Sequence, residues 1–362
     1  MYNVRMHTML GTNHSWAITM RGFADAFLKL GHNVNLISTN GTDDIPLQMQ
    51  RSTREAYDDV DIDFCYTLPR NFRSRFLRKS KAKFAIYNYE TNLMPKEWKR
   101  HSSDLDFVLP SSNFCRDIFI QNGWPEDKCV VVPLGINSEL FKDQRVCKLS
   151  TTKSFKFLNI SIPHYRKNIA GALEAYYSAF SEEDDVCFVL KTSLARPRHK
   201  FECDIRAEIA MVQKKFRGKK LPQVEVISKN FTSLVPLYNA CDVLVSASSS
   251  EGFGLPFLEA MAANKIVIAP RCTGQLDFLN DNNSVLIDCS KVQADARHQY
   301  WKPTKGAETY MVDPRSLSEK MIESYNNYSC LKGSLLKEMR NTVDLFSWES
   351  SAKKVIGLYE NI

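Results

Sequence analysis

The chain alternates short apolar segments with amphipathic ones along most of its length. The strand-like runs are residues 34–37, 60–64, 84–87, 107–109, 130–132, 157–161, 186–190, 224–227, 243–245 and 266–269. Between them, apolar residues recur every three or four positions, as in residues 16–30, and this spacing predicts helices with one buried face. Strands that alternate with helices are typical of parallel sheets covered by helices on both sides.

A polar stretch at residues 142–153 interrupts this alternation, which restarts after it. Since a domain takes roughly 150 residues, a chain of 362 residues suits two of them. We expect an N-terminal Rossmann-like domain at residues 1–145 and a second at 153–345. We expect the closing helix, residues 346–362, to pack back towards the N-terminal domain. Two doubly wound domains that face a central cleft are the predicted architecture.

The composition is that of an ordinary folded protein, with 44% apolar and 25% charged residues, which argues against disordered, collagen-like and coiled-coil chains. No apolar run reaches the roughly 18 to 20 residues that span a bilayer. The start lacks the apolar core of a secretory signal, so a cytoplasmic location is expected. The ten cysteines form no C-x-x-C pair, and we interpret them as small buried thiols rather than metal ligands or disulfides.

The net charge is +7, and residues 70–83 carry seven basic side chains with no acid between them. A solvated helix face is the interpretation we favour, because basic runs commonly form one. Docking on an anionic membrane surface is an alternative, with Phe72 and Phe76 one helical turn apart. No nucleic-acid-binding signature accompanies the charge, so we expect no nucleic-acid partner.

Residues 248–263 have the order of a binding site. A strand ends near Ala247, Gly252 and Gly254 form a short loop, and Pro256 suits the first position of a helix. The amides of residues 253–255 (Phe253, Gly254 and Leu255) would then point outward at a helix N-terminus, which favours an anion such as a diphosphate.

Two carboxylates, Glu251 and Glu259, flank this loop and helix start. Each can accept two hydroxyl hydrogen bonds, as a sugar or a ribose diol would offer. Amides for an anion beside carboxylates for diols describe a pocket for a nucleotide sugar. A glycine turn with a helix-capping glutamate also occurs in many folds, and the spacing alone leaves that purely structural alternative open.

The segment resembles the motif of glycosyltransferase family 4 in which seven residues separate two glutamates, here Glu251 and Glu259. Other landmarks of that family stand in the same order. They are Gly31-His32, Pro110–Phe114, Val132–Phe141, Arg166–Asn168 and Phe346–Trp348. The resemblance spans nearly the whole chain.

The resemblance implies an α/β fold of the GT-B type, with an N-terminal acceptor domain and a C-terminal nucleotide-sugar domain. It implies retaining transfer of a sugar from a UDP- or GDP-sugar to a saccharide, lipid-linked or other hydroxyl acceptor, in glycan or polysaccharide synthesis. The nucleotide sugar is then a substrate, and no cofactor or metal is expected. The D-x-D spelling at Asp61-Ile-Asp63 lies within a strand-like run.

The family's motif also implies roles for individual residues. Glu251 would bind hydroxyls of the transferred sugar, Glu259 would hold the ribose diol, and the amides that follow Gly252 would face phosphate and sugar. Lys167 would neutralise the departing diphosphate. Lys191 is a second cation at the end of a strand, where ligands of such sheets bind.

The chain departs from the family pattern at four places. Asn264 stands where relatives have a glycine after the motif helix, and we expect it to be tolerated because asparagine can also form a left-handed cap. Relatives carry an arginine after the first strand of the C-terminal domain, where this chain reads Asn159-Ile-Ser161, so we expect Arg166 to supply the missing charge. The first loop is Gly11-Thr-Asn-His14 instead of a double glycine. We assign Gly11 to the donor and His14 to the acceptor. Glu90, where relatives have a histidine, is assigned to the acceptor as well.

Two other classes of enzyme fit the sequence less well than a transferase. A glycoside hydrolase would give the anion-binding loop no purpose, and a nicotinamide enzyme would show G-x-G-x-x-G after its first strand. A catalytically silent nucleotide-sugar sensor or subunit of the same fold stays open, because the arginine is missing.

Overall fold

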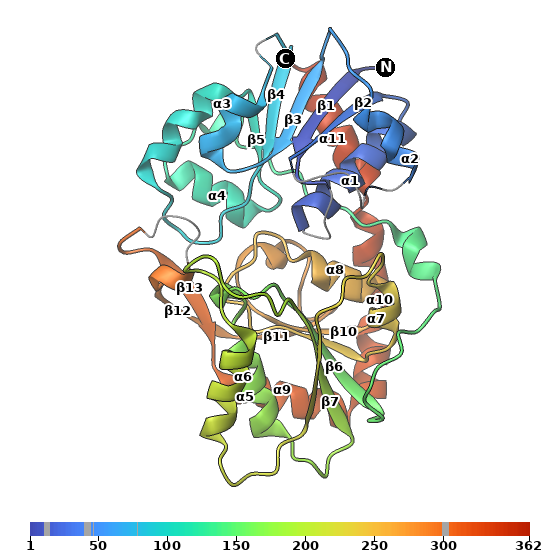
Figure 1. Cartoon of the computed structure of the whole chain (residues 1–362), viewed down its shortest axis with the longest axis vertical. Helices are drawn as coiled ribbons and strands as arrows, with labels where there is room; N and C mark the ends of the chain where they lie inside the picture. Colours follow the sequence, from blue (N-terminus) through green and yellow to red (C-terminus); the bar gives the residue numbers. More distant parts are fainter. Residues whose placement is uncertain (11–14, 40–44, 46, 78, 299–303) are drawn as a thin grey trace. The chain divides into compact units, whose positions relative to one another are not determined.

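The structure is a computed structural model that describes residues 1–10, 15–39, 45, 47–77, 79–298 and 304–362. The chain divides into two compact units. The first unit comprises Met1–Tyr89, Met94–Asn137 and Leu345–Ile362, and the second comprises Glu90–Leu93 and Ser138–Asp344. Each unit is built around a parallel sheet (Figure 1).

The sheet of the first unit has the strand order β2-β1-β3-β4-β5, with every pair parallel. Its strands are β1 (Asn3–Thr8), β2 (Asn33–Ser38), β3 (Ile62–Tyr66), β4 (Ala82–Ile86) and β5 (Phe107–Leu109). Its helices are α1 (Ser15–Lys29), α2 (Leu47–Gln50), α3 (Phe72–Arg75), α4 (Asn113–Gln121) and α11 (Trp348–Glu360). β3 is buried at every position, as a central strand covered on both faces requires.

The last helix, α11, packs on α1 within the first unit. The indole of Trp348 lies 5.4 Å from the ring of Phe23, between centroids. The chain at residues 133–136 is fixed to the start of α11 by two hydrogen bonds. The amide of Ile136 donates to the carbonyl of Phe346 at 3.0 Å, and the hydroxyl of Ser351 donates to the carbonyl of Pro133 at 2.7 Å.

The sheet of the second unit has the order β11-β10-β9-β6-β7-β8. Its strands are β6 (Phe155–Ile160), β7 (Val186–Lys191), β8 (Gln223–Ile227), β9 (Val243–Val245), β10 (Ile266–Pro270) and β11 (Val285–Ile287). Its helices are α5 (Ile169–Ala179), α6 (Ile205–Lys215), α7 (Val235–Asn239), α8 (Leu255–Ala262), α9 (Pro314–Asn326) and α10 (Tyr328–Leu345). Counted from β6, this is the 3-2-1-4-5-6 order of a doubly wound dinucleotide-binding sheet.

The remaining elements are short. An antiparallel hairpin, β12 (Cys289–Gln293) and β13 (Glu308–Val312), follows the second sheet and was not predicted. The 3₁₀ turns are Arg51–Thr53, Pro69–Asn71, Lys96–Asp104, Glu126–Lys128, Ser138–Lys142, Tyr165–Lys167, Thr273–Asp277 and Ala296–His298. No helix in the described ranges is long and apolar enough to cross a bilayer.

The acids of the D-x-D spelling take structural ion pairs. Asp63 accepts from the guanidinium of Arg5 at 2.8 Å, and the two residues are in register on adjacent strands. Asp61 pairs with the ammonium of Lys81 at 2.9 Å. Both acids therefore have cationic partners within the first unit.

The basic segment at residues 70–83 is not one continuous helix, as a single solvated helix face would require. Helix α3 spans only four residues, and β4 begins at Ala82. Phe72 is fully buried, so the pair it forms with Phe76 does not present two apolar rings to a membrane. Arg75 turns inward to His7, at 3.2 Å from its Nε2.

Seven of the ten cysteines are buried, as expected, and all ten are free thiols. Cys147 and Cys289 are half-buried. Cys330 is exposed, so the expectation of buried thiols is wrong for that residue.

The contact between α11 and residues 133–136 predicts a sensitive glycine. A methyl group on Gly135 would overlap backbone atoms of Ser347 and Trp348, which cannot rotate away. We expect Gly135→Ala to lower the free energy of unfolding by about 1–3 kcal/mol, measured by urea denaturation. Gly357→Ala, at a helical position with open space around it, is the control and should gain stability. Equal stability of Gly135→Ala and the unmodified protein would contradict the close packing.

Candidate functional site

The candidate site lies at the carboxyl ends of β6 and β9, which are neighbours in the second sheet. The strand order reverses between them, and in sheets of this kind ligands bind at that point. The loop after β6 carries Arg166 and Lys167, and the loop after β9 runs from Ser246 to Gly254. Two segments that are about 80 residues apart in the sequence are thereby brought to one edge of the sheet.

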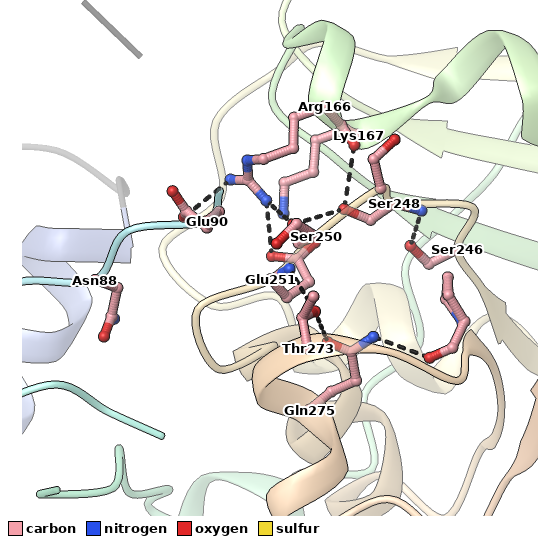
Figure 2. A network of polar contacts seen from close by, with 12 residues as sticks. Asn88, Glu90, Arg166, Lys167, Ser246, Ser248, Ser250, Glu251, Thr273 and Gln275 are labelled. Atoms are coloured by element: carbon pink, nitrogen blue, oxygen red, sulfur yellow. Dashed lines mark hydrogen bonds and ion pairs between the residues drawn. The ribbon is translucent and has the colours of Figure 1, made fainter. Parts of the chain in front are cut away.

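The loop after β9 is fixed on both sides of Glu251. The amide of Glu251 donates to the hydroxyl of Thr273 at 3.0 Å, and its carbonyl accepts from the amide of Gly274 at 2.9 Å. Thr273 in turn donates to Gln275 at 2.9 Å, and Gln275 is fully buried. The backbone of Glu251 is therefore held from behind by the turn that follows β10 (Figure 2).

Helix α8 starts at Leu255, as the sequence predicts, with Pro256 in its first turn. Gly254 caps it in the left-handed region, at φ 92°, where a side chain would be strained and would meet the ring of Phe257. The first-turn amides of a helix have no acceptor within the helix, and together with the helix dipole they favour an anion. The predicted amide positions, Phe253, Gly254 and Leu255, lie two to four residues after Glu251.

The carboxylate of Glu251 lies between two cations. Lys167 Nζ is 2.5 Å from its Oε1, and Arg166 Nη1 is 3.2 Å from its Oε2 (Figure 2). All three side chains are nearly buried, with 12% of Lys167 exposed at most. Burial alone would raise the pKa of Glu251, but the two cations outweigh it and hold the pKa at about 2. Glu251 is therefore charged at every physiological pH.

Arg166 contacts more than Glu251. Its Nη1 also donates to the carbonyl of Ser250, and its Nη2 is 3.4 Å from the carboxylate of Glu90. Its own carbonyl accepts from the amide of Ser249 at 2.8 Å. The guanidinium thus fixes the loop after β9, and it is shared between the carboxylates of Glu90 and Glu251.

Glu90 completes a charge cluster with Arg166, Glu251 and Lys167. Burial raises the pKa of Glu90, and the Arg166 guanidinium opposes that rise. Burial likewise lowers the pKa of Lys167, while Glu251 opposes the change. Two acids and two bases make the cluster formally neutral when all four are ionised.

Asn159 lies near the carboxyl end of β6, in the segment Asn159-Ile-Ser161. Its side-chain amide donates to the carbonyl of Val245 at 2.9 Å, so it joins the ends of β6 and β9. It is 1% exposed, and its Oδ1 has no hydrogen-bond partner among the described residues. Asn159 is thus a neutral side chain that ties the two strands together.

Glu259, the second acid of the motif, has a different environment from Glu251. It is the fifth residue of α8, and its Oε2 accepts from the hydroxyl of Tyr238 at 2.7 Å. Burial raises the pKa of Glu259 to about 7, and the Tyr238 hydrogen bond only partly opposes this.

One further predicted residue, Lys191, lies within the described part of the chain. It is the last residue of β7, with Nζ 6.0 Å from the ring centroid of Phe231, and burial lowers its pKa. Gly11 and His14 lie outside the described residues.

Several residues that shape the site were missed. Thr273, Gln275 and Tyr238 all hold its acids in place. Thr273 and Gln275 could have been predicted from the sequence. They follow the apolar run at residues 266–270 closely, so they must lie at the same sheet edge as Glu251. Tyr238 gives no such signal, since its spacing matches that of a buried helix face.

Residues 213–299 match the family model of glycosyl transferases group 1, so the chain carries a domain of that class, which includes both Glu251 and Glu259. A relative from Methanocaldococcus jannaschii, described as an uncharacterized glycosyltransferase, is 29% identical over 143 residues. That match covers 39% of this chain and about a third, 34%, of the relative.

Solved structures with the same fold cover nearly the whole chain. A glycosyltransferase from Rickettsia africae has a TM-score of 0.68 at 17% identity, covering 99% of this chain and 98% of its own. HepE from Anabaena, solved with UDP and glucose, has a TM-score of 0.73 at 11% identity, with both chains fully covered. Sucrose-phosphate synthase from Thermosynechococcus elongatus has a TM-score of 0.70 at 16% identity, covering 100% and 99%. The predicted α/β fold of the GT-B type is confirmed.

The raised pKa of Glu259 predicts a stability cost that depends on pH. The folded protein keeps a proton that the unfolded chain loses between the ordinary glutamate pKa of 4.5 and about 7, so stability falls as the pH rises through this interval. The quantity to compare is the free energy of unfolding of Glu259→Gln minus that of the unmodified protein. We expect this difference to be about 1–3 kcal/mol larger at pH 8 than at pH 5. Exposed Glu319→Gln is the control. A difference between Glu259→Gln and the unmodified protein that does not change with pH would refute the shift.

Proposed function

We propose that this protein is a retaining glycosyltransferase of family 4 that moves a sugar from a UDP- or GDP-sugar to a hydroxyl acceptor. The observation that carries the proposal is the carboxylate of Glu251, held by Lys167 and Arg166 directly before the N-terminus of α8. The group 1 domain over residues 213–299 supports it. A nucleotide donor is supported by HepE, whose structure was solved with UDP-glucose.

The reaction breaks the bond between the anomeric carbon and the diphosphate, which builds negative charge on the leaving group. The amides of residues 253–255 at the start of α8 and the ammonium of Lys167 stabilise that charge, and donors placed in advance in this way are worth roughly 3 to 4 kcal/mol each. No metal ion is needed for this step. Glu251 binds hydroxyls of the transferred sugar, and Glu259 binds the ribose diol. Lys191 is a further cation for the donor.

Lys167 changes partner in this mechanism. In the free protein it is bound to Glu251 at 2.5 Å. An incoming diphosphate competes with Glu251 for the ammonium of Lys167. When the ammonium leaves Glu251, Oε1 of Glu251 is free to accept sugar hydroxyls. Arg166 stays with Glu251 and Ser250, so the carboxylate keeps one cationic partner and its position. Arg166 is therefore assigned a positioning role rather than a phosphate-binding one.

The acceptor attacks from the face that the phosphate leaves, and a phosphate oxygen takes its proton, which retains the anomeric configuration. We assign Glu90, beside Arg166, to orientation of a saccharide or lipid-linked acceptor. Glycan or polysaccharide synthesis in the cytoplasm is the proposed setting. Membrane contact through residues 70–83 rests on charge alone, since Phe72 is buried.

A nucleotide-sugar sensor without activity is the second candidate, and Asn159 favours it. The neutral amide there ties β6 to β9, and the cluster around Glu251 has no net charge, so the site is poorer in cations than the family pattern.

The donor site predicts a selective loss of activity. We expect Glu251→Ala and Lys167→Ala each to lower sugar transfer at least tenfold, measured by release of nucleoside diphosphate, because each removes a group that meets the donor. Circular dichroism should show an intact fold. The matched controls are Lys215→Ala and Glu174→Ala. These two residues form an ion pair with the same 2.5 Å separation, but it lies at the surface. Near-normal transfer by both site variants would remove the assignment.

A panel of nucleotide sugars separates the two candidate functions. A donor present at 100 times its dissociation constant should stabilise the protein by about 2.7 kcal/mol, seen as a rise in Tm. Release of UDP or GDP with a sugar acceptor then identifies the enzyme. Stabilisation without release from any donor and acceptor identifies the sensor. If no nucleotide or nucleotide sugar raises the Tm, both candidates are wrong.

A further inference from the structure

Tyr238 lies in α7 and is fully buried beneath the helix that carries Glu259. Its hydroxyl donates to Glu259 Oε2 at 2.7 Å and lies 3.3 Å from the carbonyl of Pro256. The shorter contact takes the proton, because a carboxylate is the stronger acceptor. The phenol thereby links α7 to the first turns of α8 through an acid of the site.

The surroundings of Glu259 make this hydrogen bond important. The strands that pack against α8 are β9 and β10, with the sequences VLV and IVIAP, and they bring no ionisable group to it. Within the described part of the chain, Tyr238 is the titratable residue that acts on this carboxyl group. Glu251 has two cations, whereas Glu259 has one neutral donor.

The two carboxylate oxygens of Glu259 therefore have different hydrogen-bond partners. Oε2 is occupied by the phenol, while Oε1 has no hydrogen-bond donor among the residues that the structure describes. A carboxylate with one oxygen fixed from behind and the other open is suited to accept hydroxyl groups in one orientation. Helix α8 fixes the backbone of Glu259, and the hydroxyl of Tyr238 fixes its side chain.

We propose that Tyr238 is a positioning residue of the donor site, which fixes the side chain of Glu259 so that its Oε1 accepts the ribose hydroxyls of the nucleotide. The inference rests on the proposed function, in which Glu259 holds that diol. It makes nucleotide affinity depend on pH. A charged carboxylate accepts hydroxyl hydrogen bonds more strongly than a protonated one, and the pKa of Glu259 is about 7. Affinity should therefore rise between pH 6 and pH 8.

Tyr238→Phe removes the hydroxyl and keeps the ring. The hydrogen bond lowers the pKa of Glu259, so its loss moves the titration to higher pH. The dissociation constants of UDP and GDP, measured by calorimetry from pH 6 to pH 9, test this shift. The nucleotide that binds should bind about tenfold more weakly to the variant at pH 7, and the gap should narrow by pH 9. With donor, the loss should fall on KM more than on kcat.

The control is Tyr177→Phe, which removes another buried hydroxyl of the second unit, on α5. It should leave affinity and its pH profile as in the unmodified protein. Glu259→Gln serves as a second variant should Tyr238→Phe fail to fold. Its amide cannot ionise, so its affinity should stay low and should rise less with pH than that of the unmodified protein.

The outcomes separate this inference from the function on which it rests. If neither UDP nor GDP binds the unmodified protein, the proposed function fails. If a nucleotide binds but Tyr238→Phe has the same affinity and pH profile as the unmodified protein, the role of Tyr238 is refuted. A rise of affinity with pH that is as large in Glu259→Gln as in the unmodified protein refutes it as well.

Discussion

The site depends on one buried carboxylate that two cations hold in place. A charge removed from water costs several kcal/mol unless a partner compensates it, and loss of one partner from a buried pair costs about 3–5 kcal/mol. The loop after β9 therefore adopts the path that brings Glu251 to Lys167 and Arg166. Thr273 and Gly274 fix the backbone of the same residue. The geometry at the start of α8 is thus set before any ligand arrives, which is what electrostatic preorganisation requires.

The two acids of one sequence motif have opposite electrostatics. Glu251 has a pKa of about 2 because cations outweigh its burial, and Glu259 has a pKa of about 7 because only a phenol opposes its burial. A group that is always charged suits a fixed structural and binding role. A group that titrates near neutrality instead responds to its ligand, since hydrogen bonds to its charged form favour that form. The spacing of the two residues reveals none of this, because it comes from neighbours on other elements.

Local pattern and sheet topology were the features that the sequence could predict. Alternating strands and helices indicated the parallel sheets. The expectation that Lys167 lies near Glu251 came from the resemblance to the family motif, and the structure places the two side chains in contact. Partners set by the packing of distant segments, such as Glu90 for Arg166 or Tyr238 for Glu259, were not predicted. The β12–β13 hairpin was not predicted, for a different reason. Its first strand is exposed or half-buried throughout, so no apolar alternation marks it.

For the proposed nucleotide-sugar donor, the charge balance of the cluster limits how its diphosphate is bound. Glu90 and Glu251 offset Arg166 and Lys167, so the free site offers no net positive charge. The N-terminus of α8 contributes about half an elementary charge, which is less than a diphosphate carries. The deficit shrinks when Glu90, whose pKa burial raises, takes up a proton. In the proposed transferase, the protonation state of Glu90 therefore affects how well the site binds an anion.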